Sequence, residues 1–367
     1  MKEKRVDKFL LIVTFLLLTI GIAMFVSASL GVLNRSETTF YSILTKQLLF
    51  GLPLGLLGMY LASKINYKFW RKYSFFIFLT TILLTASVFI PYLGFSHQGA
   101  KRWIDFGFIT FQPVEFLKFG FIIYFAGWLS WAKNKAQSFK YGILPFIIML
   151  GVISSILLSQ PDTKSFILIA LTGIGMLFLS DVPLKYILGI GAILAISLSF
   201  FAFFNPYLQE RIETFIFPAN DPTGSSYQIQ QSMIAIGSGG VLGRGYGQSI
   251  QKFGYLPEPH GDSIFAVVGE EFGFIGSVGV IILYLLFAMR GIRIASHATD
   301  IFGRLLSAGI VIIITAQSFL NIASIIGVFP LTGVPLVFMS HGGTSLMIYL
   351  TAVGILLNIS KFQKKNI

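Results

Sequence analysis

Long uninterrupted stretches of apolar side chains constrain this chain more than any other feature. The segments from Phe9 to Val26 and from Gly276 to Met289 contain no charged residue. A helix of about 20 apolar residues spans a hydrocarbon layer of about 30 Å. Charged residues make up 11% of the chain, too few to cover the surface of a water-soluble protein of this length. We therefore predict a protein that crosses a membrane several times.

The apolar stretches predict an all-α polytopic membrane protein with about ten transmembrane helices. We place them near residues 9–30, 46–63, 73–95, 111–131, 141–159, 166–181, 186–205, 263–289, 305–323 and 346–360. The first stretch is longer than the apolar part of a secretion signal and others follow it, so we expect it to be retained. Glycines such as Gly51 and Gly55 predict close helix packing. We expect one transmembrane domain over residues 1–367.

The positions of lysine and arginine predict the orientation, because cytoplasmic loops are enriched in both residues. With a cytoplasmic N-terminus, 18 of the 27 lysines and arginines lie on the cytoplasmic side. These are Lys2, Lys4, Arg5, Lys8, Lys64, Lys68, Arg71, Lys72, Lys133, Lys135, Lys140, Lys185, Arg290, Arg293, Arg304, Lys361, Lys364 and Lys365. We predict that both termini are cytoplasmic. The net charge of +12 then follows from topology, and we expect no nucleic-acid partner.

One long polar segment, residues 205–262, lies between the seventh and eighth predicted helices and therefore on the external side. Loops longer than about 12–15 residues are usually functional or disordered. This segment contains a turn-rich part at 218–224 and the run GSGGVLGRGYG, which fits neither common phosphate-loop pattern. We expect this large external loop to be partly ordered and to carry part of an active site.

Charged residues at predicted membrane depth need a reason, because burying one costs at least about 2.5–3.5 kcal/mol. Glu115 and Lys118 are three residues apart, so they share a helix face and can pair. They either join helices or line a polar site for a charged substrate. Asp162 follows Gln160 and Pro161 at a helix end, where it either caps the next helix or faces an aqueous cavity.

Two residues close the external segment at the start of the eighth predicted helix, His260 and Asp262. A carboxylate at the boundary between water and membrane can act as a general base, because burial raises its pKa toward the value that this task needs. Asp262 suits this role and His260 could orient it, but an aspartate that caps the next helix is equally consistent with the spacing. Glu270 and Glu271 follow, and we interpret at least one of them as an acidic residue favoured in the first helical turn.

Four stretches resemble the family of shape, elongation, division and sporulation (SEDS) proteins, and the match covers nearly the whole chain. They are GAKRWIDFGFITFQPVEFLK at 99–118, QPDTKS at 160–165, the segment 211–276, and GVPLVFMSHGGTSL at 333–346. The run SIQKFGYLPEPHGDSIFA is more similar to the division branch of the family than to its elongation branch. The resemblance implies a peptidoglycan glycosyltransferase that polymerises lipid II.

The resemblance also implies roles for single residues. Asp262 matches the aspartate considered essential for polymerisation. The residues that match polar or substrate-binding positions are Glu115, Lys118, Asp162, Arg102, Arg211, Gln228 and Lys252. The chain departs from the family pattern at Val114, Lys164, Gly261, Ser263 and Val337. Glycine is common at the position of Lys164, and Gly261 and Ser263 flank Asp262. The local structure around Lys164 and Asp262 therefore cannot be inferred directly from relatives.

The implied reaction is an inverting transfer at the external membrane face. Asp262 would deprotonate the 4-hydroxyl of lipid II, which attacks the anomeric carbon of a glycan linked to undecaprenyl diphosphate. Cations near the membrane surface would stabilise the leaving diphosphate, and the candidates are Lys118, Arg211, Arg244 and Lys252. A divalent cation, Mg²⁺ or Mn²⁺, could share this charge, but no ligand cluster in the sequence specifies a metal site.

The resemblance further implies a complex with a class B penicillin-binding protein and other division proteins at the septum of a bacterial cytoplasmic membrane. Three alternatives stay open: an elongation polymerase, a lipid II flippase and a non-catalytic scaffold. A flippase predicts a site near the membrane midplane and often repeat symmetry, which we do not find in the sequence. A scaffold would not need Glu115, Lys118 and Asp162 together.

Overall fold

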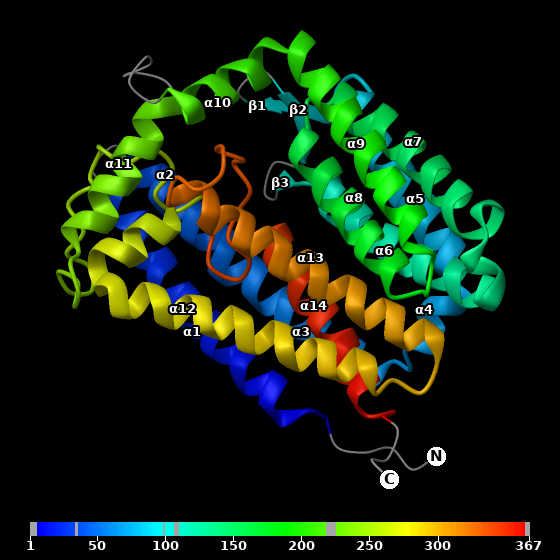
Figure 1. The fold of residues 1–367 in the computed structure, drawn as a ribbon. Coiled ribbons are helices and arrows are strands. Elements are labelled where there is room, and N and C mark those ends of the chain that lie inside the picture. The colour runs from blue at the N-terminus through cyan, green and yellow to red at the C-terminus, as the bar shows by residue number, and fades with distance from the viewer. Residues whose placement is uncertain (1–5, 34–35, 98–99, 106–109, 218–224, 364–367) are drawn as a thin grey trace.

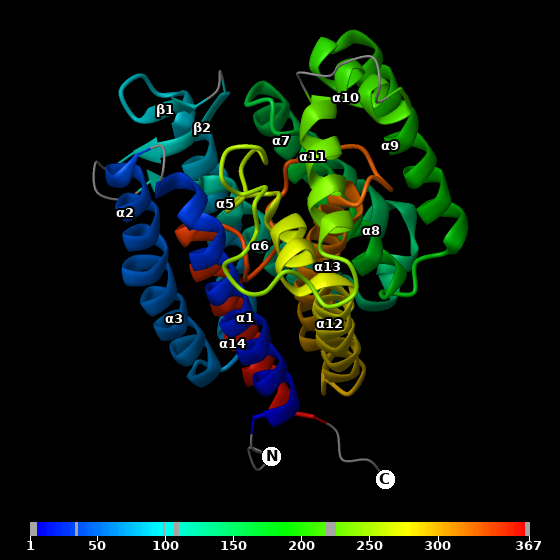
Figure 2. The ribbon, with the colours of Figure 1, turned by 90° about the vertical axis from the view of Figure 1, so that its left-hand side faces the viewer.

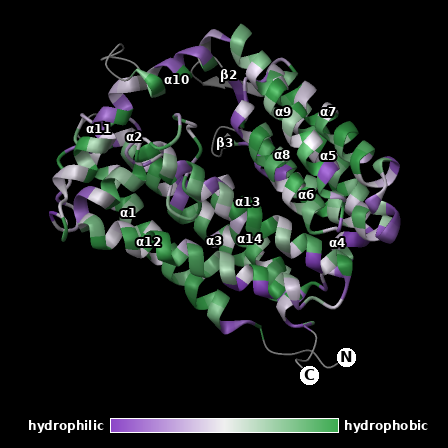
Figure 3. Cartoon of the chain, in the orientation of Figure 1, coloured by the Kyte–Doolittle hydropathy of each residue, from purple (hydrophilic) through white to green (hydrophobic). Residues whose placement is uncertain are grey.

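The computed structural model describes residues 6–33, 36–97, 100–105, 110–217 and 225–363. Over these ranges the chain forms a bundle of long helices, in which α1 (Lys8–Leu33) begins at the same end at which α14 (Gly343–Ser360) finishes (Figure 1). This arrangement agrees with the prediction that the two termini share one side of the membrane. Hydrophobic residues dominate the long helices, and hydrophilic residues gather on α10 and α11 and at the helix ends (Figure 3).

Most of the chain between these two helices is also helical. The other helices are α2 (Glu37–Thr45), α3 (Leu52–Lys64), α4 (Lys68–Lys72), α5 (Ser74–Ala86), α6 (Pro113–Ala132), α7 (Leu144–Ser159), α8 (Thr163–Phe178), α9 (Leu184–Phe204), α10 (Pro206–Ile216), α11 (Ser225–Ser238), α12 (Ile264–Ser296) and α13 (Ile301–Ile325). Short turns of π-helix at Lys46–Gly51 and Phe139–Ile143 lead into α3 and α7.

Eight of the ten predicted membrane spans are confirmed, because among the described residues 8 helical segments are long and apolar enough to cross a membrane. The spans predicted near 73–95 and 166–181 correspond to shorter apolar helices, Ser74–Phe89 and Thr163–Phe178. Helix α3 packs along α14, and α12 packs along both α1 and α13. A Cβ on Gly51 would lie 2.6 Å from the Cα of Gly343, and one on Gly55 would lie 2.7 Å from Leu350 Cδ1. Both glycines therefore permit close helix packing, as expected.

A small β-sheet adds to the predicted helical fold. Strands β1 (Gly94–His97), β2 (Ala100–Asp105) and β3 (Thr110–Phe111) form an antiparallel sheet between α5 and α6, so the expected helix over 73–95 ends too late. The helical conformation stops at Ile90, whose backbone is extended. A residue that precedes proline is pushed out of the helical region, and Pro91 follows Ile90.

The external segment is partly ordered, as expected, and it contains two helices. Asn205 caps α10, because its side chain accepts a hydrogen bond from Leu208 N (3.4 Å). Helices α10 and α11 arch from α9 to α12 (Figure 1), while the turn-rich part at 218–224 lies outside the described residues. From Gly239 to Asp262 the chain is irregular and folds back against α12 (Figure 2).

Helix α12 is interrupted at Gly273, whose backbone (φ 65°, ψ −160°) suits glycine alone among common residues. A break in a helix leaves backbone donors and acceptors without intrahelical partners. The external segment supplies them: Phe274 N donates to Gly240 O (2.9 Å), and Arg244 N donates to Glu270 O (3.0 Å). The break in α12 therefore holds the segment that precedes Asp262.

The predicted topology can be tested with single cysteines, because the native chain has none. Lys101 lies exposed on β2 and Lys135 lies exposed in the short turn after α6, on opposite sides of the predicted membrane. An impermeant thiol reagent applied to intact spheroplasts should label Lys101→Cys and spare Lys135→Cys. Labelling of Lys135→Cys alone would reverse the orientation.

Candidate active site

Asp262 stands where the external segment meets α12. Its Oδ1 accepts a hydrogen bond from Nε2 of Gln228 on α11 (3.2 Å), and the same Nε2 also donates to Ser263 Oγ (2.9 Å). Ser263 occupies the N-cap position of α12 and forms no side-chain cap bond. The alternative that Asp262 caps α12 is therefore wrong. The carboxylate is partly exposed and is held by a side chain from another helix.

The backbone around Asp262 is fixed by the segment between α13 and α14. Asn321 on α13 donates through Nδ2 to the carbonyl oxygens of Asp262 (2.7 Å) and Val334 (2.8 Å). The backbone N–H of His341 donates to the carbonyl of His260 (2.7 Å). These bonds join two external connections that lie far apart in the sequence.

Two cations and the Asp262 carboxylate surround Gly333 in this same connection. A Cβ on Gly333 would lie 3.5 Å from Asp262 Oδ2, 3.7 Å from Arg211 Nη2 and 3.8 Å from Lys164 Nζ. Lys164 on α8 donates to the carbonyl of Gly333, and Arg211 on α10 donates to the carbonyl of Leu331. Elements that are distant in sequence thus bring a base and two cations to one place.

The surroundings of Asp262 favour a carboxylate that can accept a proton. Burial raises the pKa of the Asp262 carboxyl, the Lys164 ammonium opposes this shift, and the Glu258 carboxylate adds to it. Burial lowers the pKa of the His260 imidazole, which favours the neutral ring. The His260 ring packs edge-on against the His341 ring (centroids 5.5 Å apart), and its Nε2 lies 3.9 Å from Glu258 Oε2. These contacts do not support the expected role of His260 in orienting Asp262.

Glu115 and Lys118 form the predicted ion pair on α6. Lys118 Nζ lies 2.8 Å from Glu115 Oε1 and also donates to Gln317 Oε1 (3.0 Å) and Tyr349 OH (3.4 Å). Both charged side chains are buried. The pair therefore joins α6 to α13 and α14, and a role in substrate binding stays a prediction.

Arg102 and Asp162 lie at the predicted external ends of α7 and α8. Arg102 on β2 donates through Nε to the carbonyl of Gln160 (2.9 Å) and also donates to that of Pro161. Asp162 is buried and caps α8, because its Oδ1 accepts from Ser165 N (3.3 Å). The capping interpretation of Asp162 is confirmed. Its Oδ2 has no hydrogen-bond partner within the described residues.

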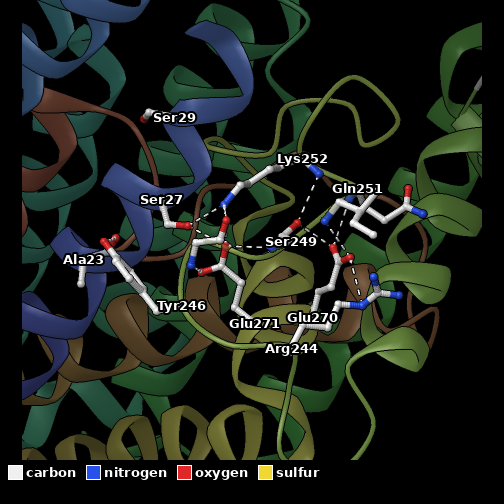
Figure 4. Close-up of polar contacts among 12 residues, drawn as sticks. Ala23, Ser27, Ser29, Arg244, Tyr246, Ser249, Gln251, Lys252, Glu270 and Glu271 are labelled. Carbon is white, nitrogen blue, oxygen red and sulfur yellow. Dashed lines mark hydrogen bonds and ion pairs between the residues drawn. The ribbon is translucent and has the colours of Figure 1, made fainter. Parts of the chain in front are cut away.

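Lys252 lies in a second cluster, in which its ammonium is fully used. Its Nζ donates to Glu271 Oε1 (2.7 Å), Ser27 Oγ (2.9 Å) and the carbonyl of Gly247 (2.9 Å). Ser27 on α1 donates in turn to Glu271 Oε1 (2.6 Å). Both charged side chains are buried (Figure 4). We call this pair with its neighbours Ser27, Ser249, Arg244 and Glu270 the clasp.

Glu270 completes the clasp on the other side. Its carboxylate accepts from Ser249 Oγ (2.6 Å), Ile250 N (2.9 Å) and Gln251 N (3.2 Å), and Arg244 Nε lies 3.7 Å from it (Figure 4). The first-turn interpretation of Glu270 and Glu271 is wrong, because α12 begins at Ile264 and both carboxylates bind the external segment. The contacts of Lys252 and Arg244 are to these glutamates rather than to Asp262.

The sequence matches the FtsW/RodA/SpoVE family, described as cell cycle proteins, over residues 7–365. The chain belongs to this family. Probable peptidoglycan glycosyltransferase FtsW of Geobacter sp. (strain M18) is 38% identical over 354 residues, which cover 96% of each chain. Stage V sporulation protein E of Bacillus subtilis (strain 168) is 37% identical over 366 residues, which cover 99% of each chain. The family resemblance inferred from the four stretches is confirmed.

Solved structures share the fold of this family member. A chain from the structure described as "Structural coordination of polymerization and crosslinking by a peptidoglycan synthase complex" superposes with a TM-score of 0.80 at 25% identity, over 97% of each chain. The rod shape determining protein RodA of Thermus thermophilus superposes with a TM-score of 0.72 at 23% identity, over 98% of each chain. The polytopic fold is confirmed by both.

Several residues of the site escaped the sequence analysis. Asn321 and Gln317 lie one helical turn apart on α13 within an apolar stretch, so amides at membrane depth are the signal that could have revealed them. Lys164 was noted as a departure from the family pattern, without a role. Gly333 was noted only as the first residue of a family motif, because its part in the site depends on side chains from three other segments.

The clasp predicts a paired effect on stability. Removing one member of a buried ion pair leaves the other charge uncompensated, at a cost of about 3–5 kcal/mol. Lys252→Met should therefore lower the thermal unfolding midpoint of the detergent-solubilised protein strongly, and Lys252→Met with Glu271→Gln should recover most of it. Arg244→Gln is the matched control and should change the midpoint little, because that side chain is 36% exposed. Equal losses in the single and double variants would contradict a coupled pair.

Proposed function

We propose that this protein is a peptidoglycan glycosyltransferase that polymerises lipid II at the external membrane face during septal cell-wall synthesis. The observation that carries the proposal is the convergence of Asp262, Lys164 and Arg211 on Gly333 at the predicted external ends of the helices. Membership in the family supports it, because curated relatives that align along almost the whole chain are named as probable peptidoglycan glycosyltransferases.

Asp262 acts as the general base in the proposed reaction. It takes the proton of the 4-hydroxyl on the acceptor sugar while that oxygen forms a bond to the anomeric carbon of the donor. The bond from this carbon to the diphosphate oxygen breaks, and the configuration inverts. The raised pKa of Asp262 strengthens it as a base, and the Gln228 amide orients the carboxylate.

The leaving diphosphate carries negative charge that nearby cations must stabilise. Arg211 suits this role, because it is partly exposed and lies beside Asp262. Lys252 suits this role less, because all three N–H donors of its ammonium already bind acceptors inside the clasp. A divalent cation bound to the diphosphate itself stays a prediction. No group of three or more His, Cys, Asp or Glu residues that could hold a metal occurs among the residues described.

The proposed partner is a class B penicillin-binding protein that cross-links the new glycan. Support comes from the similarity to a chain of a peptidoglycan synthase complex that couples polymerisation and crosslinking. Other division proteins and a place at the septum of the bacterial cytoplasmic membrane belong to the same proposal. A scaffold role alone would leave unexplained why a partly exposed base and two cations lie close to one point.

The role of Asp262 predicts a loss of activity without a loss of structure. Asp262→Asn keeps the shape and can still accept the Gln228 bond, but it cannot take a proton. Polymerisation of lipid II by the purified protein with its transpeptidase should fall by a factor of about 10² to 10⁴. Asp262→Glu should restore little, because a longer side chain moves the base away from the attacking oxygen.

Asp181→Asn is the matched control for Asp262→Asn. Its carboxylate is 76% exposed and lies 3.7 Å from Arg304 Nη2, on the predicted cytoplasmic side, so this variant should polymerise lipid II at nearly the native rate. Gel analysis of the glycan products measures both variants. Native rates for Asp262→Asn would remove this residue from the mechanism.

Variants of the buried Glu115–Lys118 pair on α6 can distinguish a structural role of the pair from a role in the reaction. Glu115→Gln and Lys118→Met should each lower the thermal midpoint, and the double variant should recover it, because it leaves no unpaired charge. If the pair also serves the substrate, the stable double variant should still polymerise lipid II poorly. Full activity in the double variant would assign Glu115 and Lys118 to helix packing alone.

A further inference from the structure

Lys164 is a cation in an unfavourable place. It is the second residue of α8, where the helix dipole disfavours positive charge. The positive charges of Arg102 and Lys118 repel the Lys164 ammonium, and the carboxylates of Asp162 and Asp262 attract it. The family resemblance offers no counterpart for a lysine here, so its role must follow from its contacts.

The contacts of Lys164 leave its ammonium able to bind more. The side chain is partly exposed and donates to the carbonyl of Gly333. Within the described residues it has no ion pair within 4.0 Å, whereas an ammonium has three donors. Asp162 does not neutralise it by contact, since that carboxylate is buried and caps α8.

Arg211 brings a second cation to the same point. Its guanidinium is partly exposed, donates to the carbonyl of Leu331, and places Nη2 beside the same point on Gly333 as Lys164 Nζ. An ammonium and a guanidinium that lie near one point beside a residue without a side chain form a site for an anion with several oxygens. A side chain at residue 333 would occupy that point.

We propose that Lys164, together with Arg211, binds the diphosphate of the polyprenyl carrier next to Asp262. This inference rests on the proposed function and adds a residue to it. As the bond from the anomeric carbon to the diphosphate breaks, the bonding electrons go to the leaving oxygen, and the ammonium donates a charge-assisted hydrogen bond to that diphosphate. The proton of the attacking hydroxyl goes to Asp262.

A binding experiment tests the site without requiring polymerisation. Binding of undecaprenyl diphosphate and of undecaprenyl phosphate to the purified full chain is measured in EDTA, so that no divalent cation bridges lipid and protein. Lys164→Gln should weaken binding of the diphosphate lipid about tenfold and that of the monophosphate lipid much less, because one charge-assisted hydrogen bond is lost. Lys164→Arg should stay within about threefold of the native affinity.

Lys101→Gln is the matched control, because this lysine is exposed on β2 on the same predicted face. It should bind both lipids as the native chain does. Native affinity of Lys164→Gln for the diphosphate lipid would overturn the inference. Equal weakening for both lipids, or failure of Lys164→Arg to rescue, would also overturn it and assign Lys164 to holding Gly333. A native chain that binds the diphosphate lipid selectively but does not polymerise lipid II would instead count against the proposed function.

Discussion

The buried ion pair between Lys252 and Glu271 is the interaction on which the placement of Asp262 depends. Charges in a low-dielectric interior are tolerated only when they are paired and hydrogen-bonded. The pair meets this condition by drawing in Ser27 from α1 and the carbonyl of Gly247 (Figure 4). One ion pair thus ties α1 and α12 to the irregular segment that leads to Asp262.

The interruption of α12 makes this tie geometrically possible. Because Gly273 breaks the helix, backbone groups of α12 become available to the glycine-rich segment, which pairs with them on both sides of the break. Glu270 and Glu271 lie just before the break and bind the same segment through their side chains. The segment that leads to Asp262 is therefore fixed by main chain and side chains together, without regular structure of its own.

The sequence predicted the membrane spans and the family well, because apolar length and ordered motifs are local properties. It did not predict burial. Lys252 and Lys118 look like cations available to a substrate when they are read along the chain, yet partners hundreds of positions away use their hydrogen bonds. The short strands of the sheet were missed for a related reason, since they are stabilised by one another rather than by a periodic pattern of their own.

Three lysines show how one residue type is divided between structure and chemistry in this fold. Lys252 and Lys118 are buried beside a carboxylate, each within 2.8 Å or less, so each joins elements of the bundle and has little capacity left for a ligand. Lys164 has the opposite surroundings, since it is partly exposed and, among the described residues, donates to one carbonyl. Desolvation of an ammonium is costly unless a full negative charge compensates it, and a carbonyl does not. An anionic ligand at Gly333 would supply that charge, so the same physical rule that makes the clasp structural supports the proposal that Lys164 binds substrate.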